Sequence, residues 1–124
     1  MINLGKLFES FKYAIAGLRK VFWQEQNFRI HIITSLIVIT LAVFFEIEAW
    51  QFIVIILIIS LVLILEIINT IFERLLDLLK PRLHQYVKDI KDMTAAAVFI
   101  SSLAAIIIGL IIFLPYFIQV FIII

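Results

Sequence analysis

The sequence contains no cysteine, only three glycines and only two prolines among its 124 residues. Without cysteine, the chain has no disulfide and no thiolate metal site. The glycines stand far apart, at Gly5, Gly17 and Gly109, so neither a Walker A loop nor the glycine-rich loop of protein kinases can form. Any nucleotide site in this chain is therefore of another kind.

Charged residues are scarce as well. They make up 15% of the chain, whereas 65% is hydrophobic and the mean hydropathy is +1.24. A soluble domain is about half apolar and about a quarter charged, so a water-soluble fold of this length would expose much of its apolar surface. The composition predicts an integral membrane protein. We expect residues 1–124 to form one membrane-embedded domain, with no cleavable signal peptide at the start.

The apolar pattern divides the chain into one amphipathic segment and three apolar spans. About residues 4–22, apolar side chains recur at steps of three and four, which predicts a helix that lies in the membrane interface or packs on the protein's own bundle. Three further segments, about 28–45, 50–72 and 93–114, are each long enough to cross a bilayer core of about 30 Å. The sequence therefore predicts an all-α integral membrane fold: an N-terminal amphipathic surface helix and a bundle of three transmembrane helices.

The basic residues predict the orientation. All ten Lys and Arg residues precede or open the first span or surround the loop between the second and third spans. The positive-inside rule then places the N-terminus and that loop in the cytoplasm and the C-terminus outside. Trp23 and Trp50 fall near opposite interfaces, as aromatic belts require.

Four polar side chains share one face of the helix that contains the second span. They stand at i, i+3, i+7 and i+11, and they are Glu66, Asn69, Glu73 and Asp77. Glu66 follows a long apolar run, where a carboxylate costs several kcal/mol unless it is paired or hydrated. An acid at that depth is a candidate functional residue.

Three uses of this acidic face are consistent with the residues alone. Basic side chains could neutralise it and hold the helices together; the available partners are Lys88, Lys91 and Arg29. One ion pair would suffice for that purpose, whereas a row of acids repels itself, so we favour a hard cation such as Mg²⁺, which takes oxygen ligands. A proton or ion pathway is disfavoured because the second span has no continuous run of polar residues.

Other polar residues near the membrane surface carry weaker signals. Lys91 and Asp92 open the third span, where a lysine can bind phosphate as a point charge. The helix of that span is expected to begin around Val87, with His84 in the loop before it. We interpret His84, and also His31 at the start of the first span, as interfacial hydrogen-bonding residues in preference to ligands or proton carriers.

Several blocks of the sequence resemble the prokaryotic diacylglycerol kinase family. Residues 66–77, EIINTIFERLLD, resemble its E-x-x-N-(S/T)-x-x-E-x-x-x-D signature. Residues 11–19 look like its N-terminal helix, residues 25–31 like the start of its first span, and residues 91–98 like the start of its third. The spacing between the blocks also matches, and the resemblance covers nearly the whole chain.

The resemblance implies a fold and an activity. Members of the family are homotrimers of three-span subunits that transfer the γ-phosphate of ATP to a lipid hydroxyl with the help of Mg²⁺. By position, Glu66 is implied as the general base, Glu25 and Glu73 as the magnesium ligands, and Asn69 as a residue that orients the site. Contacts with the nucleotide are implied for Tyr13, Asp77, Arg82, Leu83, His84, Lys91 and Asp92. Lys6 is implied near the lipid substrate, and Arg29 as a support of the acidic residues.

The acceptor lipid is the least determined part of this picture. Residues 25–31, the pair Asn69-Thr70 and residues 109–115 look most like the undecaprenol kinase branch, so we expect undecaprenol as the acceptor and diacylglycerol as the alternative. A non-enzymatic membrane scaffold or assembly subunit is the competing class, and it would leave the acidic face without a use. The expected location is the bacterial cytoplasmic (inner) membrane.

Overall fold

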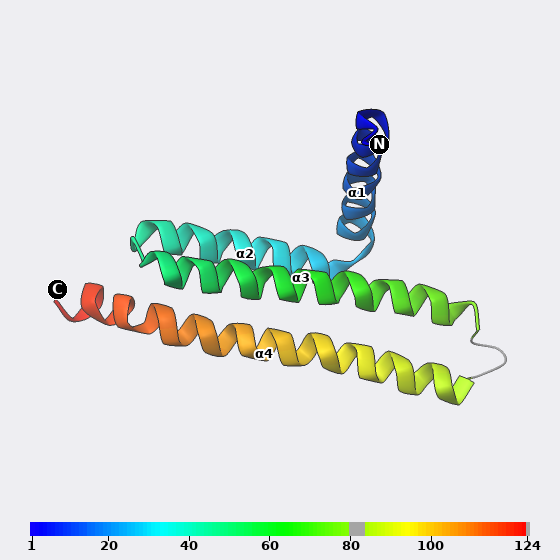
Figure 1. Cartoon of the computed structure of the whole chain (residues 1–124). Coiled ribbons are helices and arrows are strands. Elements are labelled where there is room, and N and C mark those ends of the chain that lie inside the picture. The colour runs from blue at the N-terminus through cyan, green and yellow to red at the C-terminus, as the bar shows by residue number, and fades with distance from the viewer. Residues whose placement is uncertain (80–83, 124) are drawn as a thin grey trace.

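The computed structural model describes residues 1–79 and 84–123, which form four helices (Figure 1). In chain order these are α1 (Leu4–Gln24), α2 (Gln26–Phe44), α3 (Ala49–Asp77) and α4 (His84–Ile122). The last three are long and apolar enough to cross a membrane. The predicted fold class, with a separate N-terminal helix and three spanning helices, is therefore confirmed.

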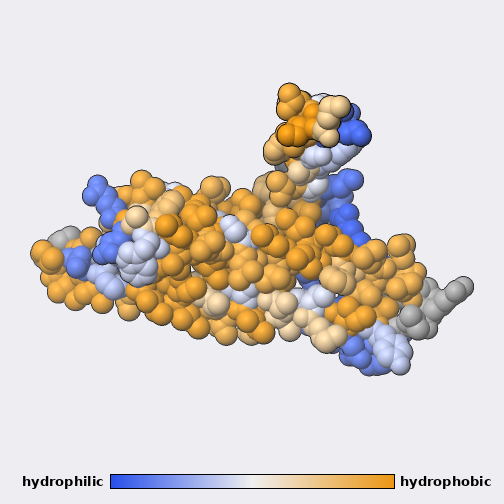
Figure 2. Space-filling view, viewed as in Figure 1, coloured by the Kyte–Doolittle hydropathy of each residue, from blue (hydrophilic) through white to orange (hydrophobic). Residues whose placement is uncertain are grey.

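Helix α3 is the centre of the bundle. Both α2 and α4 pack along it, and all three run side by side (Figure 1). Only a small part of their surface is buried within the chain. Figure 2 shows an almost continuous apolar surface over these helices, with hydrophilic residues gathered at the two ends of the bundle. Such a surface is expected where lipid is the solvent.

The end of the bundle that contains the α2–α3 turn holds its main apolar cluster. Ala42, Ile55, Ile112 and Phe113 are buried there. The ring of Phe45 lies against three aromatic rings of α4, and its centroid is 4.9 Å from that of Phe117. Aromatic contacts of this kind stabilise beyond the area that they bury. The Tyr116 hydroxyl also donates a hydrogen bond to Gln51 Oε1 (2.7 Å), which joins α4 to α3.

Helix α1 projects sideways from the bundle, across its long axis (Figure 1). None of its residues is buried, so its apolar stripe does not pack on the bundle of its own chain. Its N-terminus is capped by Asn3, whose side-chain oxygen accepts from the backbone N–H of Gly5 (3.0 Å). A helix that crosses the bundle axis and exposes an apolar stripe is suited to the plane of a membrane interface.

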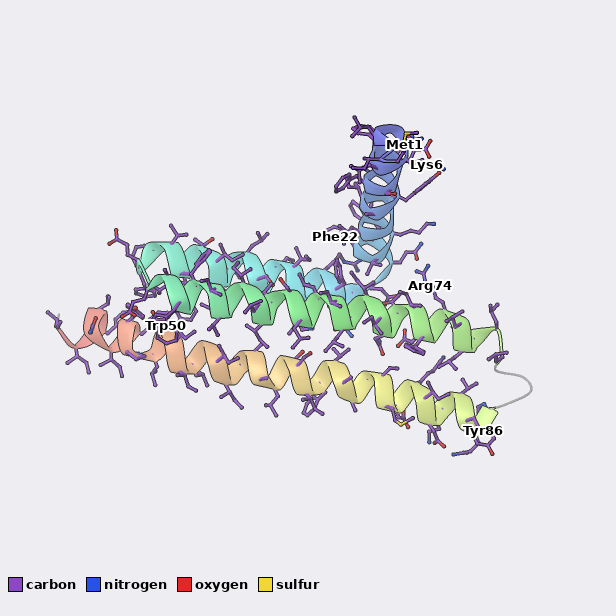
Figure 3. All side chains as sticks on the ribbon, viewed as in Figure 1. Met1, Lys6, Phe22, Trp50, Arg74 and Tyr86 are labelled. Carbon is purple, nitrogen blue, oxygen red and sulfur yellow. The ribbon has the colours of Figure 1, made fainter. Side chains whose placement is uncertain are left out.

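Two arginines tie the end of α1 to the bundle. Arg29 of α2 donates from Nη1 to the backbone carbonyls of Phe22 (2.9 Å) and Trp23 (2.8 Å), which are among the last in α1. Arg74 of α3 bonds to the side chain of Gln24, and Figure 3 shows it beside the foot of α1. Arg29 therefore positions α1 through backbone carbonyls, and its support of the acidic residues stays a prediction.

Helix α4 begins earlier than the sequence suggested. The expected start around Val87 is wrong by one turn, because His84 is already helical and does not lie in a loop. A hydrogen bond from Gln85 Nε2 to Asp89 Oδ1 (3.3 Å) supports this added turn. At the other end, α4 continues through Pro115 to Ile122. Proline within a spanning helix is tolerated where local adjustments satisfy the freed carbonyl.

Candidate active site

The site is built around Glu66, which is buried in α3 with 4% of its surface exposed. Its Oε1 atom lies 3.1 Å from Nε2 of His31 in α2, which is hydrogen-bonding distance. One turn further along α3, Thr70 is also buried and donates from its hydroxyl to the Glu66 carbonyl (3.0 Å). The intramembrane acid is therefore satisfied by a partner from another helix, as the cost of burying it requires.

His31 is the residue whose role the sequence reasoning missed. The interpretation of His31 as a hydrogen-bonding residue agrees with the structure, but the sequence did not identify its partner, which is the most buried acid of the chain. The two residues stand on different helices, so no local spacing links them. The available signal was indirect: an acid within a span needs a partner, and His31 is the titratable residue of the first span that lies beyond its opening arginine.

Two more acids gather near Glu66. Glu25, the extended residue between α1 and α2, and Glu73, two turns further along α3, are both electrostatic neighbours of its carboxyl group. Asn69 donates from Nδ2 to Glu73 Oε1 (3.2 Å). Glu25, which is distant in sequence, is thus an electrostatic neighbour of Glu66 in the folded chain, as Glu73 is.

The oxygen atoms of this cluster fit a hard cation. The Oδ1 atom of Asn69 is buried and has no hydrogen-bond partner within the described parts of the chain, although a buried acceptor normally has one. Carboxylate and amide oxygens are the ligands that Mg²⁺ takes. Among the described residues, no three His, Cys, Asp or Glu side chains are close enough to hold a metal by themselves.

A second group of predicted site residues lies towards the α3–α4 connection. Lys91 Nζ of α4 is 2.6 Å from Asp77 Oδ1 of α3, and the two side chains are 30% and 58% exposed. The suggestion that a basic residue neutralises the acidic row is therefore correct for Asp77, while Glu66 contacts His31 instead. Asp92 and His84 are exposed on the same part of α4, whereas Arg82 and Leu83 lie outside the described residues.

The structure does not bring the α1 residues to the acidic cluster. Tyr13 is 71% exposed, on a helix with no buried residue. Lys6 lies close to Met1 at the end of α1 that is remote from the bundle (Figure 3). Any contact of these two residues with a substrate must therefore come from the exposed side of α1.

Comparison with known proteins identifies the family. The profile described as "Prokaryotic diacylglycerol kinase" matches residues 12–113. The chain belongs to this family. The matched segment includes the acidic cluster, His31 and the Lys91–Asp77 pair. The match confirms the predicted family. It covers the residues that form the acidic cluster and the contacts around it.

The relatives of this chain include proteins named for two lipid kinase activities. A Synechocystis protein named diacylglycerol kinase is 41% identical over 110 residues, which is 88% of this chain but only 63% of the relative. The Bacillus subtilis undecaprenol kinase is 33% identical over 113 residues, 91% of this chain and 92% of the relative. The Escherichia coli K12 diacylglycerol kinase is 30% identical over 95 residues, 77% of this chain and 78% of the relative. These names include two different acceptor lipids.

Proposed function

We propose that this protein is a lipid kinase that transfers the γ-phosphate of ATP to the hydroxyl group of a membrane lipid alcohol. The observation that carries the proposal is the contact between buried Glu66 and partly exposed His31, with Glu25 and Glu73 as electrostatic neighbours of Glu66. A structural role would need only one ion pair, whereas here three carboxylates gather. Kinases of lipid alcohols are also what the names of the relatives describe.

In the proposed step Glu66 acts as the general base. Its carboxylate takes the proton of the lipid hydroxyl while the hydroxyl oxygen attacks the γ-phosphorus of ATP. The bond between that phosphorus and the β–γ bridging oxygen breaks, and the products are a lipid phosphate and ADP. A positioned base contributes about 10²–10⁴-fold to such a step. The hydrogen-bonding contact with His31 keeps the Glu66 side chain in one orientation, so the base does not have to be ordered during the reaction.

Glu25, Glu73 and the Oδ1 atom of Asn69 are the proposed ligands for Mg²⁺. When bound, Mg²⁺ would neutralise the charge on the phosphate oxygens. The Asn69–Glu73 hydrogen bond fixes one of these carboxylates relative to α3. Positioning and charge neutralisation supply most of the catalysis in phosphoryl transfer, so a site made of a few side chains is sufficient.

The nucleotide is proposed to bind at the exposed end of α3 and α4, with contacts from Asp77, Lys91, Asp92 and His84, and from Arg82 and Leu83 in the connection. The Lys91–Asp77 pair is partly exposed, and such pairs contribute only about 0–1 kcal/mol. Lys91 can therefore exchange its partner for a phosphate at little cost. Tyr13 is proposed to reach the base of ATP from α1.

Undecaprenol is the proposed acceptor, and diacylglycerol is the alternative. The blocks at residues 25–31 and 109–115 resemble the undecaprenol kinase branch. The Bacillus subtilis undecaprenol kinase also matches this chain over 92% of its own length. We further propose that the protein lies in the bacterial cytoplasmic membrane as a homotrimer, with its N-terminus inside, because all the basic residues lie on that side.

The test is phosphate transfer from γ-labelled ATP, with and without Mg²⁺, to undecaprenol and to dioleoylglycerol in detergent micelles. We expect label in undecaprenol, little in dioleoylglycerol and none without Mg²⁺. A preference for dioleoylglycerol would retain the reaction and overturn the acceptor. No label in either lipid, from protein that is shown to be folded, would overturn the kinase in favour of a membrane scaffold.

A further inference from the structure

Glu25 is the proposed magnesium ligand that no helix carries. It is the single residue between α1 and α2, and its backbone is extended, with φ −113° and ψ 112°. Its N–H donates to the Val21 carbonyl in α1 (2.8 Å), and its own carbonyl accepts from the N–H of Arg29 in α2 (3.3 Å). Because its two sides are bonded to different helices, a change in the direction of α1 requires a change in the φ or ψ of Glu25. Rotation about ψ turns the Glu25 side chain with respect to α2 and α3.

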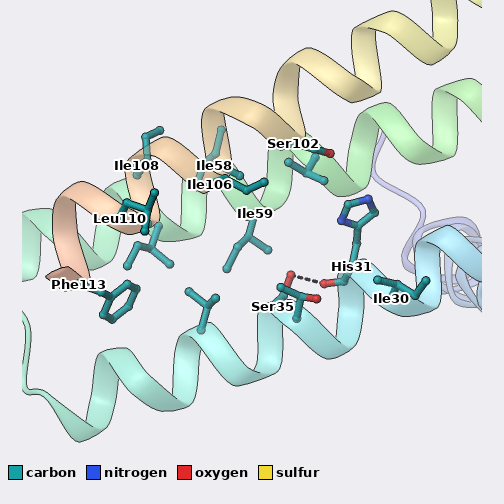
Figure 4. A pocket seen from close by; sticks show the side chains of 16 residues that line it. Ile30, His31, Ser35, Ile58, Ile59, Ser102, Ile106, Ile108, Leu110 and Phe113 are labelled. Carbon is teal, nitrogen blue, oxygen red and sulfur yellow. Dashed lines mark hydrogen bonds between the residues drawn. The ribbon is translucent and has the colours of Figure 1, made fainter. Parts of the chain in front are cut away.

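The proposed base is supported in a different way. The Glu66 side chain is buried in the bundle, where His31 contacts it from α2. His31 also lines a cavity of about 480 Å³ between α2, α3 and α4, and the Ser35 hydroxyl donates to its carbonyl (Figure 4). Glu25 is only partly buried, and its carboxylate makes no hydrogen bond or ion pair within the parts of the chain that the structure describes. The position of this carboxylate therefore depends on contacts that hold the neighbouring backbone.

Two arginines hold the end of α1 through neutral acceptors. Arg29 donates to two backbone carbonyls in the last turn of α1 (2.9 and 2.8 Å), and Arg74 donates from Nη2 to Oε1 of Gln24. A guanidinium group matches a carboxylate in shape and charge, yet neither arginine forms an ion pair among the described residues. The carboxylate of Glu25, next to these acceptors, is thus left available for a cation.

The Arg74–Gln24 bond joins the two segments that carry the proposed metal ligands. Gln24 directly precedes Glu25, and Arg74 directly follows Glu73, although the bonded residues are 50 positions apart. Figure 3 shows Arg74 beside the foot of α1. Since Arg29 belongs to α2 and Arg74 to α3, the end of α1 is held from two different helices. Contacts with two helices restrict the direction of α1 as well as its distance from the bundle.

We propose that Arg74 is a positioning residue for the metal site: by holding Gln24, it keeps the Glu25 carboxylate beside the acidic residues of α3. The inference rests on the proposed function, in which Glu25 and Glu73 bind Mg²⁺. If the Glu25 segment had to be ordered when the cation binds, the lost conformational freedom would weaken binding. Loss of Arg74 would therefore weaken the metal site without removing a ligand.

The charge of Arg74 predicts the opposite result, which makes the test sharp. A positive charge near a cation site repels the cation, so an arginine that acted only through its charge would bind metal less well than its neutral variant. Arg74 is exposed, and Arg74→Met therefore leaves the packed bundle intact. A weaker metal site in this variant would report positioning.

The probe is Mn²⁺ alone, which takes the same oxygen ligands as Mg²⁺ and is measured by electron paramagnetic resonance without nucleotide or lipid. We expect Arg74→Met and Gln24→Leu each to weaken Mn²⁺ binding about three- to tenfold, the effect of one hydrogen bond. The double variant should be no weaker than either single variant, because both remove the same contact. In a Glu25→Gln background, Arg74→Met should have no further effect. Unchanged or tighter binding in Arg74→Met, with binding by the wild type, would overturn the proposal.

Arg19→Gln is the matched control for these variants. Arg19 is an exposed arginine of α1 that makes no hydrogen bond or ion pair among the described residues. The substitution removes the same charge from the same region but leaves the Arg74–Gln24 bond in place. We expect Mn²⁺ binding within twofold of the wild type, and a loss equal to that of Arg74→Met would overturn the proposal.

A second measurement needs neither metal nor nucleotide. Hydrogen exchange in micelles reports the N–H groups at the end of α1, including that of Glu25, which bonds to Val21. We expect these groups to exchange several-fold faster in Arg74→Met and at the wild-type rate in Arg19→Gln. Unchanged exchange in Arg74→Met would overturn the proposal even in an active kinase. Faster exchange with weaker Mn²⁺ binding, in a protein that transfers no phosphate, would support the positioning role and overturn the kinase reaction instead.

Discussion

The two ends of the bundle differ in the kind of side chain that the same three helices bring together. At the aromatic end, defined by Ala42, Phe45, Ile112 and Phe113, the buried side chains are apolar and pack directly against one another. At the acidic end, defined by Glu25, Glu66, Asn69 and Glu73, the carboxyl group of Glu66 is buried, and the buried Oδ1 atom of Asn69 has no partner in the described structure. The comparison teaches that the aromatic end supplies direct apolar packing between the helices, whereas the acidic end leaves one buried oxygen without a hydrogen bond among the described residues.

The largest expected effect is at the acidic end. Glu66→Gln keeps the shape of the side chain but removes the base, so we expect phosphate transfer to fall by about 10²–10⁴-fold. Glu9→Gln is the matched control, because Glu9 is exposed on α1. The measurement is the rate of transfer to the lipid, with size-exclusion chromatography as a check of folding. Near-normal activity of Glu66→Gln would refute the role of Glu66.

The next effect separates positioning from simple packing. His31→Leu fills a similar space but leaves Glu66 without its partner, so we expect kcat to fall by about 10–100-fold. His31→Gln retains a hydrogen-bond donor and should recover most of this loss. A structural role would predict similar kcat values for the two variants and a difference only in stability. The ratio of their kcat values is therefore the deciding measurement.

At the aromatic end, we expect a substitution to lower the stability more than it lowers kcat. Ala42 is only 2% exposed, so Ala42→Leu would overpack the cluster and lower the stability by about 1–3 kcal/mol. We expect the kcat of the folded protein to change less than threefold, because the cluster is remote from Glu66. Unfolding by sodium dodecyl sulfate in micelles measures the stability. Val43→Leu, at an exposed neighbouring position, should leave both quantities unchanged, and a large loss of kcat in Ala42→Leu would contradict the division of the two ends.

The smallest effect on stability is expected at the Lys91–Asp77 pair. Asp77→Asn weakens a partly exposed ion pair, so the stability should change by less than about 1 kcal/mol. If this pair belongs to the nucleotide site, the KM for ATP should rise several-fold while the KM for the lipid stays the same. Titration with ATP at saturating lipid checks this. A change in stability with no change in the KM for ATP would make the pair structural.

Much of the acidic end was predictable because its residues follow one helix. Glu66, Asn69 and Glu73 share a face by their spacing alone, and the Asn69–Glu73 hydrogen bond is an i, i+4 contact. The number of spans was predictable because hydropathy responds to length and composition. The start of α4 was misjudged, since the end of a helix depends on local contacts such as that between Gln85 and Asp89.

The sequence by itself determined that this is an all-α membrane protein with an acidic face on its second span, because helical period and hydropathy are local properties. Only the tertiary structure decided that His31 contacts Glu66, that Glu25 joins the same cluster, and that a cavity separates α2 from α4. Each of these depends on how helices are rotated and set against one another. That arrangement is determined by the packing of many side chains at once, which no local pattern records.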